Sequence, residues 1–270
     1  MSNEMETVAR RAIFGAGEII REHIGRVSDS WIQNKGPSDY VTEVDRRCEA
    51  LIMGLIRDRF PDHHIMSEET DNDGLLPGYT WVIDPLDGTT NFIHGFPFVA
   101  VSIAVCKDKK PVLGLVLDPI RNELFSAVEG GGAFLNGRPI RLRAGVSLEK
   151  SLLATGFPFR ILNYLDDYLN AFRRISPKVS GIRRAGAAAL DLAYLGAGRV
   201  DGFWEIGLKA WDIAAGALIV QEAGGRISDF RGEENHLQNG NVVAGTPAVY
   251  PFLLEQVGRW IVPAFDAQEV

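Results

Sequence analysis

The chain has 270 residues, of which 46% are hydrophobic and 23% charged, and this composition excludes wholesale disorder. The net charge of −7 argues against binding along a nucleic acid, which requires a positively charged face. The two cysteines, Cys48 and Cys106, lie in helix and strand patterns, so we expect buried thiols in a reducing interior. Because no signal-peptide pattern and no run of about 18 apolar residues is present, we expect a cytoplasmic protein that does not enter the membrane.

Residues 1–145 predict two helices followed by an antiparallel meander. Apolar residues recur at helical spacing from Val8 to Ile20 and again from Val44 to Phe60, and Pro61 ends the second helix. A short strand is predicted at 64–68. The alternation of larger and smaller side chains from Phe98 to Cys106 is typical of a strand. Further strand patterns follow at 111–117, 123–128 and 133–135, with a turn at Asn136-Gly137.

Residues 146–270 alternate between helix and strand patterns, which predicts a layered α/β half. Helices are expected at 164–176, 187–197, 210–223 and 247–260, and strands at 178–183, 200–206, 226–230 and 241–245. We find no obvious linker, so we expect the two halves, 1–145 and 146–270, to pack closely.

The segment from Trp81 to Phe92 carries the most specific signal. An apolar run ends at Asp84, and Asp87 follows three residues later. Open α/β sheets bind their ligands at the carboxyl ends of their strands, where Asp84 is expected to lie. Gly88 permits a close backbone approach, and Thr89 begins a run suited to opening a helix, whose free N–H groups can bind phosphate.

Two carboxylates beside a phosphate site require a cation. At about 4 Å, two like charges repel by roughly 1 to 4 kcal/mol for effective dielectric constants of 80 to 20, and an anionic phosphate adds to that repulsion. A divalent ion that prefers oxygen ligands, such as Mg²⁺, reverses the sign of the interaction. A solvated turn rich in aspartate is the simpler alternative for this segment.

Five more carboxylates occupy strand ends or helix starts elsewhere in the chain. Glu68 and Glu69 end a short strand, Asp45 opens a helix, and Asp212 follows the strand that ends at Glu205. Each one alone is more often a helix cap or a surface group. Their shared placement, however, is where a layered fold gathers its ligand groups.

The sequence resembles the inositol monophosphatase family, and bacterial members most closely. Asp84-Pro-Leu-Asp87-Gly-Thr-Thr-Asn91 is similar to the first family signature, and the segment from Trp211 to Gly216, with Glu222-Ala-Gly-Gly225 downstream, is similar to the second. Glu68-Glu69 stands where the family has an acidic pair, and residues 181–189 resemble its substrate loop. The resemblance covers almost the whole chain and implies a layered α-β-α-β-α sandwich of mixed α/β class, with the site between the halves.

The resemblance also implies the roles of individual residues. Two or three Mg²⁺ ions would be held by Glu68, Asp84, the carbonyl of Leu86, Asp87 and Asp212. Thr89, paired with Asp45, would position the attacking water, and Glu68 would help to hold a third ion through water. Glu69 would lie in the outer shell around Thr89 and Asp45. The residues expected to contact substrate are Glu68, Leu86, Asp87, Gly88, Thr89, Gly186, Ala187, Ala188, Glu205 and Asp212.

The implied reaction is hydrolysis of a small phosphate monoester, with inositol 1-phosphate as the first candidate. Water activated by Mg²⁺ would attack in line, without a phospho-enzyme. Fructose-1,6-bisphosphatase, phosphoadenosine phosphatase and histidinol-phosphatase activities occur on the same fold, and the choice would depend on Glu205 and on residues 155–165 and 183–188. The family usually has Thr or Ser where Ala187 stands, so a hydroxyl contact to substrate is missing here. A homodimer and inhibition by Li⁺ are further family expectations.

Two other classes compete with this reading. A haloacid-dehalogenase-type phosphatase forms an aspartyl-phosphate, but its acids stand two apart near the N-terminus, whereas Asp84 and Asp87 stand three apart and well inside the chain. Some bacterial relatives serve as RNA-processing or transcription accessory factors, and the arginine pairs are compatible with that role. Arg183-Arg184, next to the substrate loop, is equally compatible with stabilising a dimer. Because the set of metal ligands is complete, we expect such a role to be additional to catalysis.

Overall fold

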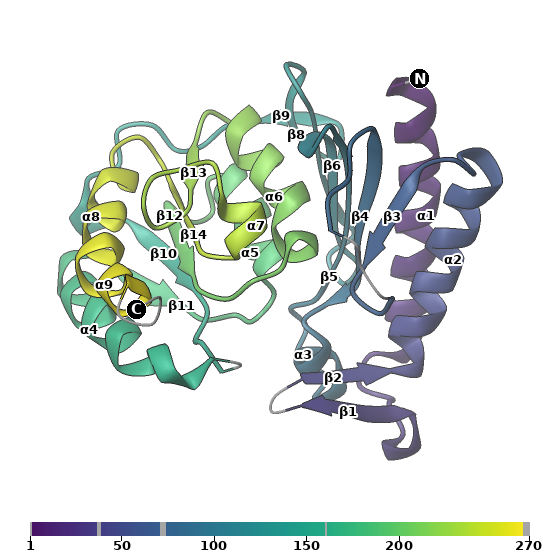
Figure 1. Ribbon diagram of the computed structural model, residues 1–270, viewed down its shortest axis with the longest axis horizontal. Helices are drawn as coiled ribbons and strands as arrows, with labels where there is room; N and C mark the ends of the chain where they lie inside the picture. The colour runs from purple at the N-terminus through teal and green to yellow at the C-terminus, as the bar shows by residue number, and fades with distance from the viewer. Residues whose placement is uncertain (1, 37–38, 71–73, 160, 267–270) are drawn as a thin grey trace.

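The computed structural model describes residues 2–36, 39–70, 74–159 and 161–266. Within them the chain forms five layers (Figure 1). The helices α1 (Ser2–His23) and α2 (Glu43–Arg59) cover one face of a seven-stranded sheet, and α5 (Ala188–Gly196) and α6 (Ala210–Glu222) cover the other. A five-stranded sheet follows, with α4 (Leu165–Ile175) and α8 (Tyr250–Trp260) outside it. The predicted α-β-α-β-α sandwich is confirmed.

The seven-stranded sheet contains the predicted meander in chain order. Its strands are β3 (His64–Ser67), β4 (Tyr79–Asp87), β5 (Ala100–Lys107), β6 (Lys110–Asp118), β7 (Glu123–Val128), β8 (Gly132–Leu135) and β9 (Arg138–Ile140). The strands from β4 to β9 pair antiparallel, whereas β3 is parallel to β4. The predicted turn between β8 and β9 has positive φ angles at Asn136 and Gly137, 48° and 75°, as two-residue hairpins require.

The five-stranded sheet has the order β11-β10-β12-β14-β13. Its strands are β10 (Leu152–Thr155), β11 (Gly181–Arg183), β12 (Gly202–Glu205), β13 (Arg226–Ser228) and β14 (Val242–Gly245). We did not predict β10, because four residues are too few to show a periodicity. The strand predicted at 178–183 is shorter in the structure, since residues Ser176–Lys178 form a 3₁₀ turn that contains Pro177.

Four smaller elements also escaped prediction. The hairpin of β1 (Ile32–Gly36) and β2 (Asp39–Thr42) is mainly polar and gives no alternating pattern. The helix α7 (His236–Asn239) is a single turn, and α9 (Val262–Asp266) follows α8 directly. The short helix α3 (Thr89–Ile93) lies where the sequence predicted a helix start.

The alternation in β5 separates two hydrophobic cores. Val99, Val101, Ile103 and Val105 belong to the core beneath α1 and α2, whereas Ala100, Ala104 and Cys106 face the core that contains α5 and α6. Small side chains on the second face let the helices approach closely. A Cβ at Gly114 of β6 would lie only 2.8 Å from the carbonyl oxygen of Ala215 in α6.

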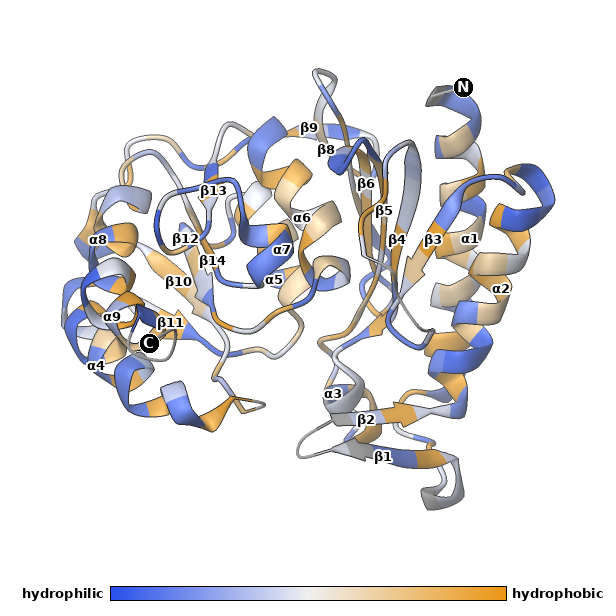
Figure 2. Ribbon diagram, in the orientation of Figure 1, coloured by the Kyte–Doolittle hydropathy of each residue, from blue (hydrophilic) through white to orange (hydrophobic). Residues whose placement is uncertain are grey.

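Helix α6 packs between the two sheets and is therefore apolar on most sides. Figure 2 shows hydrophobic colours over most of α6, whereas α2 carries a hydrophilic outer face. Residues of α6 contact β5 and β6 of the seven-stranded sheet and β13 of the five-stranded sheet. The division at residue 145 stays a prediction, because α6 joins both halves. In the described part of the chain, no helix has the length and apolarity needed to cross a membrane.

Candidate metal-binding site

A β-bulge in β4 explains why the two aspartates of the first motif stand three residues apart. Asp84 pairs with Ser102 of β5, but Asp87 pairs with Ala100, so β4 contains one extra residue between them. An extra residue reverses the side-chain alternation that follows it. Asp84 and Asp87 therefore face the same side of the sheet, toward α5 and α6, while Leu86 is buried in the opposite core.

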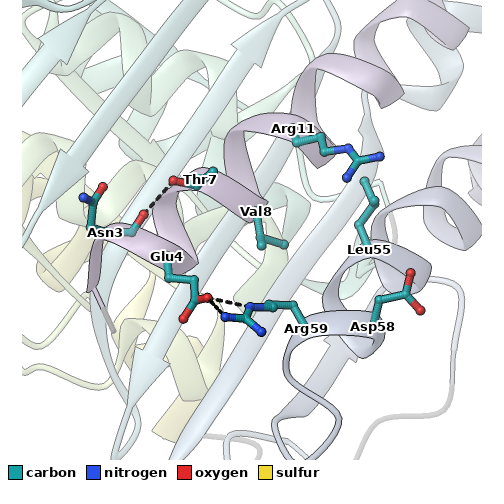
Figure 3. Close-up of a pocket in the computed structure, with 8 residues that line it drawn as sticks. All are labelled: Asn3, Glu4, Thr7, Val8, Arg11, Leu55, Asp58 and Arg59. Carbon is teal, nitrogen blue, oxygen red and sulfur yellow. Dashed lines mark hydrogen bonds and ion pairs between the residues drawn. The ribbon is translucent and has the colours of Figure 1, made fainter.

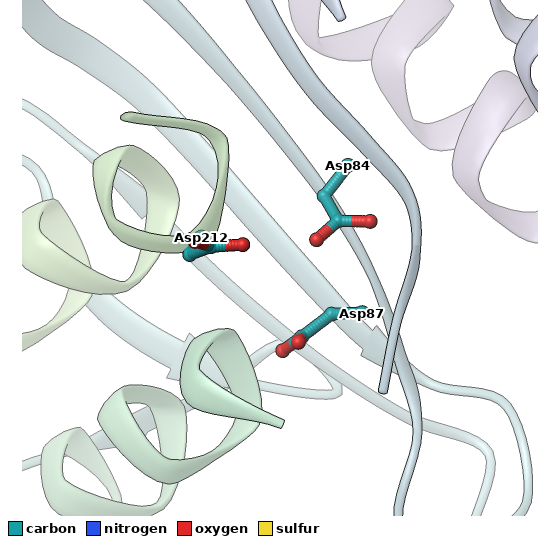
Figure 4. A group of neighbouring side chains, drawn as sticks. All are labelled: Asp84, Asp87 and Asp212. Atoms are coloured by element: carbon teal, nitrogen blue, oxygen red, sulfur yellow. The ribbon is translucent and has the colours of Figure 1, made fainter. Parts of the chain in front are cut away.

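Asp212 in the first turn of α6 completes a group of three carboxylates. One oxygen of each carboxylate lies within 4.8 Å of an oxygen of the other two. Figure 4 shows Asp84 and Asp87 reaching from β4 toward Asp212. Asp84 is 1% exposed and Asp87 8%. Oδ2 of Asp212 accepts a hydrogen bond from the backbone N–H of Lys209 at 2.7 Å, which fixes the side chain at the helix start.

The burial of these carboxylates and their mutual repulsion favour a bound cation. Burial, followed by the charges of Glu68, Asp87 and Asp212, raises the pKa of Asp84 well above its ordinary value. Burial and the charge of Asp212 raise the pKa of Asp87 to about 8. Closely spaced, buried oxygen donors of this kind are stable as anions only beside a cation, and hard divalent ions prefer such donors. The arrangement fits Mg²⁺.

Thr89 connects this group to a buried carboxylate in α2. Its hydroxyl lies 3.1 Å from Asp45 Oδ1 and 3.2 Å from the carbonyl oxygen of Leu86, so it can donate to either. The second oxygen of Asp45 accepts hydrogen bonds from the backbone N–H and the hydroxyl of Thr42. Burial raises the pKa of Asp45 to about 6, against the opposing effect of these hydrogen bonds. Asp45 is thus both a helix cap and a partner of Thr89.

The turn at Gly88 brings the first motif against the loop before α5. Gly88 has φ of 91°, and a Cβ there would lie 3.1 Å from Phe98 O and 3.3 Å from Gly186 O. The side-chain amide of Asn91 donates to Phe98 O at 2.8 Å and to Ala185 O at 2.9 Å. From the sequence, Asn91 was identified only as the last residue of the first family signature, in the run suited to opening a helix. Its hydrogen bonds show that it ties α3 to the loop of residues 184–188.

A cavity of about 340 Å³ surrounds these groups. Most of the predicted site residues line it, namely Glu68, Asp84, Leu86, Asp87, Gly88, Thr89, Gly186, Ala188, Glu205 and Asp212. Two predicted site residues, Asp45 and Ala187, do not line the cavity themselves. Asp45 reaches the cavity through Thr89, and Ala187 is 1% exposed, facing the turn at Gly88.

The cavity also has walls that sequence reasoning did not assign. Among them are Tyr40 of the unpredicted hairpin, His94 and Leu208. The wall also includes Phe157, Phe159 and Arg184, which lie in the predicted segments 155–165 and 183–188. The guanidinium of Arg184 lies 4.9 Å from the centre of the Phe159 ring. Phe159 lies in the segment 155–165 that we expected to affect substrate choice, of which position 160 lies outside the described residues.

Glu205 reaches the cavity because Gly156 has no side chain. A Cβ at Gly156 would lie 1.9 Å from Glu205 Oε1, well inside contact distance. Glu205 ends β12, and Gly156 follows the neighbouring parallel strand β10. The side chain of Glu205 therefore reaches across from β12, and its carboxylate lies directly over the backbone of Gly156.

A second, larger cavity of about 590 Å³ lies between α1 and α2 (Figure 3). It is lined by Asn3, Glu4, Thr7, Val8, Arg11, Leu55, Asp58 and Arg59. Glu4 and Arg59 form an ion pair across it. Its carboxylates, Glu4 and Asp58, do not belong to the group of three around Asp84, so the chemistry points to the smaller cavity.

Comparisons with known proteins agree with this geometry. Residues 1–260 match the sequence model of the inositol monophosphatase family. The Nus factor SuhB of Pseudomonas aeruginosa is 51% identical over 266 residues, with 96% of this chain and 98% of the relative covered. The inositol-1-monophosphatase of Mesorhizobium japonicum is 42% identical over 253 residues, with 92% and 94% covered.

Solved structures give the same result. The extragenic suppressor protein suhB of Bartonella henselae has a TM-score of 0.89 at 41% identity, over 94% of this chain and 98% of that chain. The resemblance of the two sequence motifs is thereby confirmed, and the chain belongs to the inositol monophosphatase family.

Proposed function

We propose that this protein is a Mg²⁺-dependent phosphatase of small phosphate monoesters, with inositol 1-phosphate as its preferred substrate. The observation that supports this most strongly is the convergence of Asp84, Asp87 and Asp212, whose oxygens lie within 4.8 Å of one another beside Thr89. A cavity of about 340 Å³ next to them leaves room for a small ester.

The acids of this cavity are the ligands in this proposal. Asp84, Asp87 and Asp212 would hold Mg²⁺ together with Glu68 and the carbonyl of Leu86, as two to three ions per subunit. When bound, Mg²⁺ supplies charge neutralisation and activation of water at neutral pH. Glu68 lines the same cavity, and its charge contributes to the raised pKa of Asp84.

The remaining steps belong to the chain itself. The backbone N–H groups of Gly88 and Thr89 would hold the phosphate oxygens at the start of α3. While the Thr89 hydroxyl donates to Asp45, its oxygen can accept a hydrogen bond from the attacking water and so orient that water. The water oxygen forms a bond to phosphorus, the ester P–O bond breaks, and a proton passes to the alcohol. No covalent intermediate with the protein is required.

Substrate choice would depend on the opposite wall of the cavity. Glu205 and the loop residues Gly186, Ala187 and Ala188 would contact the alcohol part of the substrate. A carboxylate suits the hydroxyl groups of a polyol, because it accepts several hydrogen bonds. Ala187 offers only its backbone, since its side chain is buried against the turn at Gly88.

A panel of phosphate esters tests the proposal. Inositol 1-phosphate, fructose 1,6-bisphosphate and adenosine phosphates are compared with Mg²⁺ and with a chelator. The variants Asp87→Asn and Asp212→Asn should lose nearly all turnover, whereas Asp58→Asn, an exposed carboxylate of α2, should not. Turnover of Asp87→Asn at the wild-type rate, or a phospho-aspartate trapped by rapid quenching, would contradict the assignment.

A second candidate function is a regulatory role in transcription. The relative that is 51% identical bears the name Nus factor SuhB, which agrees with the accessory role considered from the sequence. Capture of transcription components by the wild type and by Asp87→Asn separates the two functions. Equal capture by both would show binding that does not depend on catalysis.

We also propose a homodimer and inhibition by Li⁺, both from family membership. Light scattering during size-exclusion chromatography measures the mass of the assembly. A titration of Li⁺ at fixed Mg²⁺ measures the inhibition. A monomeric mass at all concentrations, or turnover that does not respond to Li⁺, would contradict the corresponding expectation.

A further inference from the structure

Ser102 is a buried polar residue on the sheet face that carries Asp84. It is 1% exposed, and its neighbours on that face of β5 are Ala100 and Ala104, both fully buried. Ser102 pairs directly with Asp84 across the antiparallel strands. Directly opposed residues project to the same face of a sheet, so the side chains of Ser102 and Asp84 both face α6.

The hydroxyl of Ser102 donates a hydrogen bond to the carbonyl oxygen of Trp211 at 3.1 Å. Trp211 immediately precedes Asp212 in the first turn of α6. The bond therefore joins the strand that pairs with β4 to the helix turn that carries the third acid. The two segments stand 109 residues apart in the chain.

A second contact fixes α6 one turn further along. A Cβ at Gly114 of β6 would lie 2.8 Å from Ala215 O and 3.0 Å from Ala215 Cα, so helix and sheet backbones are in direct contact there. Asp212 lies between the two contacts, at Trp211 and Ala215. Its distance from Asp84 and Asp87 is thus set by how α6 rests on β5 and β6.

This placement has to be maintained against repulsion. The three acids face one another at short distance, and when they are ionised without a cation they push α6 away from β4. From these contacts we infer that Ser102 is a positioning residue, which holds Asp212 at ligand distance from Asp84 and Asp87 and so sets the affinity for Mg²⁺. The inference rests on the proposed function of this site.

Calorimetric titration of the metal-free protein with Mg²⁺, and with Mn²⁺ as a second probe, tests the inference. Ser102→Ala should bind either ion about fivefold more weakly, the effect of one lost neutral hydrogen bond. With saturating Mg²⁺, the KM for the phosphate ester should stay unchanged, because Ser102 is not among the residues that line the cavity.

Ser126→Ala is the matched control. Ser126 is 4% exposed on β7 of the same sheet, and its hydroxyl accepts a hydrogen bond from Arg10 of α1 on the other face. The variant Ser126→Ala loses a buried hydroxyl, but its affinity for Mg²⁺ should equal that of the wild type. Gly114→Ala should also weaken Mg²⁺ binding, because its Cβ must displace Ala215 and thereby shift α6 relative to the sheet.

The outcomes separate this inference from the proposed function. If Ser102→Ala binds Mg²⁺ as tightly as the wild type, the serine only stabilises the fold and the inference is overturned. Equal weakening by Ser126→Ala would overturn it as well. If the wild type itself binds neither ion, the proposed function fails first.

Discussion

Asp87 of β4 accepts a hydrogen bond from the backbone N–H of Ala189 in α5, with 2.8 Å between Oδ2 and N. Helix α5 begins after Ala187, whose side chain cannot cap it. The free N–H groups of a helix start require an acceptor, and here a carboxylate 102 residues away supplies it. The same side chain thus belongs to the carboxylate group and holds the helix that follows the substrate loop.

This dual contact predicts different results for two substitutions of Asp87. Asp87→Asn keeps an oxygen that can cap α5, so it should retain the fold while losing turnover. Asp87→Ala removes the cap as well. Its free energy of unfolding should be about 1 kcal/mol lower than that of Asp87→Asn, as expected for loss of a helix cap. Chemical denaturation with a chelator present measures the difference. Equal stability of the two variants would show that the bond to Ala189 contributes nothing.

The contact between Thr89 and Asp45 predicts a catalytic role for the hydroxyl. Thr89→Ala should lower kcat by about 10² to 10⁴, the usual range for loss of a proton-handling group, whereas Thr89→Ser keeps the hydroxyl and should retain most of the activity. Thr7→Ala is the control, since Thr7 is an exposed residue of α1 whose hydroxyl donates to Asn3 O. A fully active Thr89→Ala would exclude the proposed orientation of the water.

The raised pKa values predict that the metal-free protein loses stability as the pH rises. Folding raises the pKa of Asp45 from 3.8 to about 6 and that of Asp87 from 3.8 to about 8. The folded state therefore holds these protons more tightly than the unfolded state. The resulting stability is fully present below the unfolded pKa and is lost as the pH passes through the folded values.

Thermal unfolding with a chelator, from about pH 5 to about pH 9, measures this dependence. The Tm should fall toward high pH, and Asp87→Asn should remove the part of the fall between about pH 6 and about pH 8, the folded pKa values of Asp45 and Asp87. Added Mg²⁺ should restore the Tm at high pH. A Tm that rises with pH in the chelated wild type would contradict the assignment of these pKa shifts.

The position of Glu205 over Gly156 predicts a change in substrate choice without loss of the chemistry. Glu205→Gln should change the ratio of kcat/KM between inositol 1-phosphate and an aryl phosphate by about tenfold, as expected for one weakened charged hydrogen bond. Gly156→Ala should have the same effect, because its Cβ displaces the Glu205 carboxylate.

Gly54→Ala provides the control for the glycine substitution. A Cβ at Gly54 of α2 would meet nothing within 4 Å, so this change should leave the substrate ratio unaltered. If Gly156→Ala and Gly54→Ala behave alike, the position of Glu205 does not determine specificity.

The sequence predicted most of the fold because its patterns are local. The alternation from Phe98 to Cys106 and the apolar spacing in α2 follow directly from the periods of strands and helices. Elements without such a pattern were missed. The hairpin β1–β2 is polar, and β10 is too short, so their places in the structure depend on the neighbours with which they pair.

By itself, the sequence determined which acids belong together, since each stands at a strand end or a helix start. Only the tertiary structure decided how they face one another. The bulge that turns Asp87 toward Asp84, the cap that Asp87 provides to Ala189, and the bond from Ser102 to Trp211 all join residues whose relative positions the local pattern leaves open. Such contacts depend on how whole layers pack, because the side chains meet only after the helices rest on the sheet.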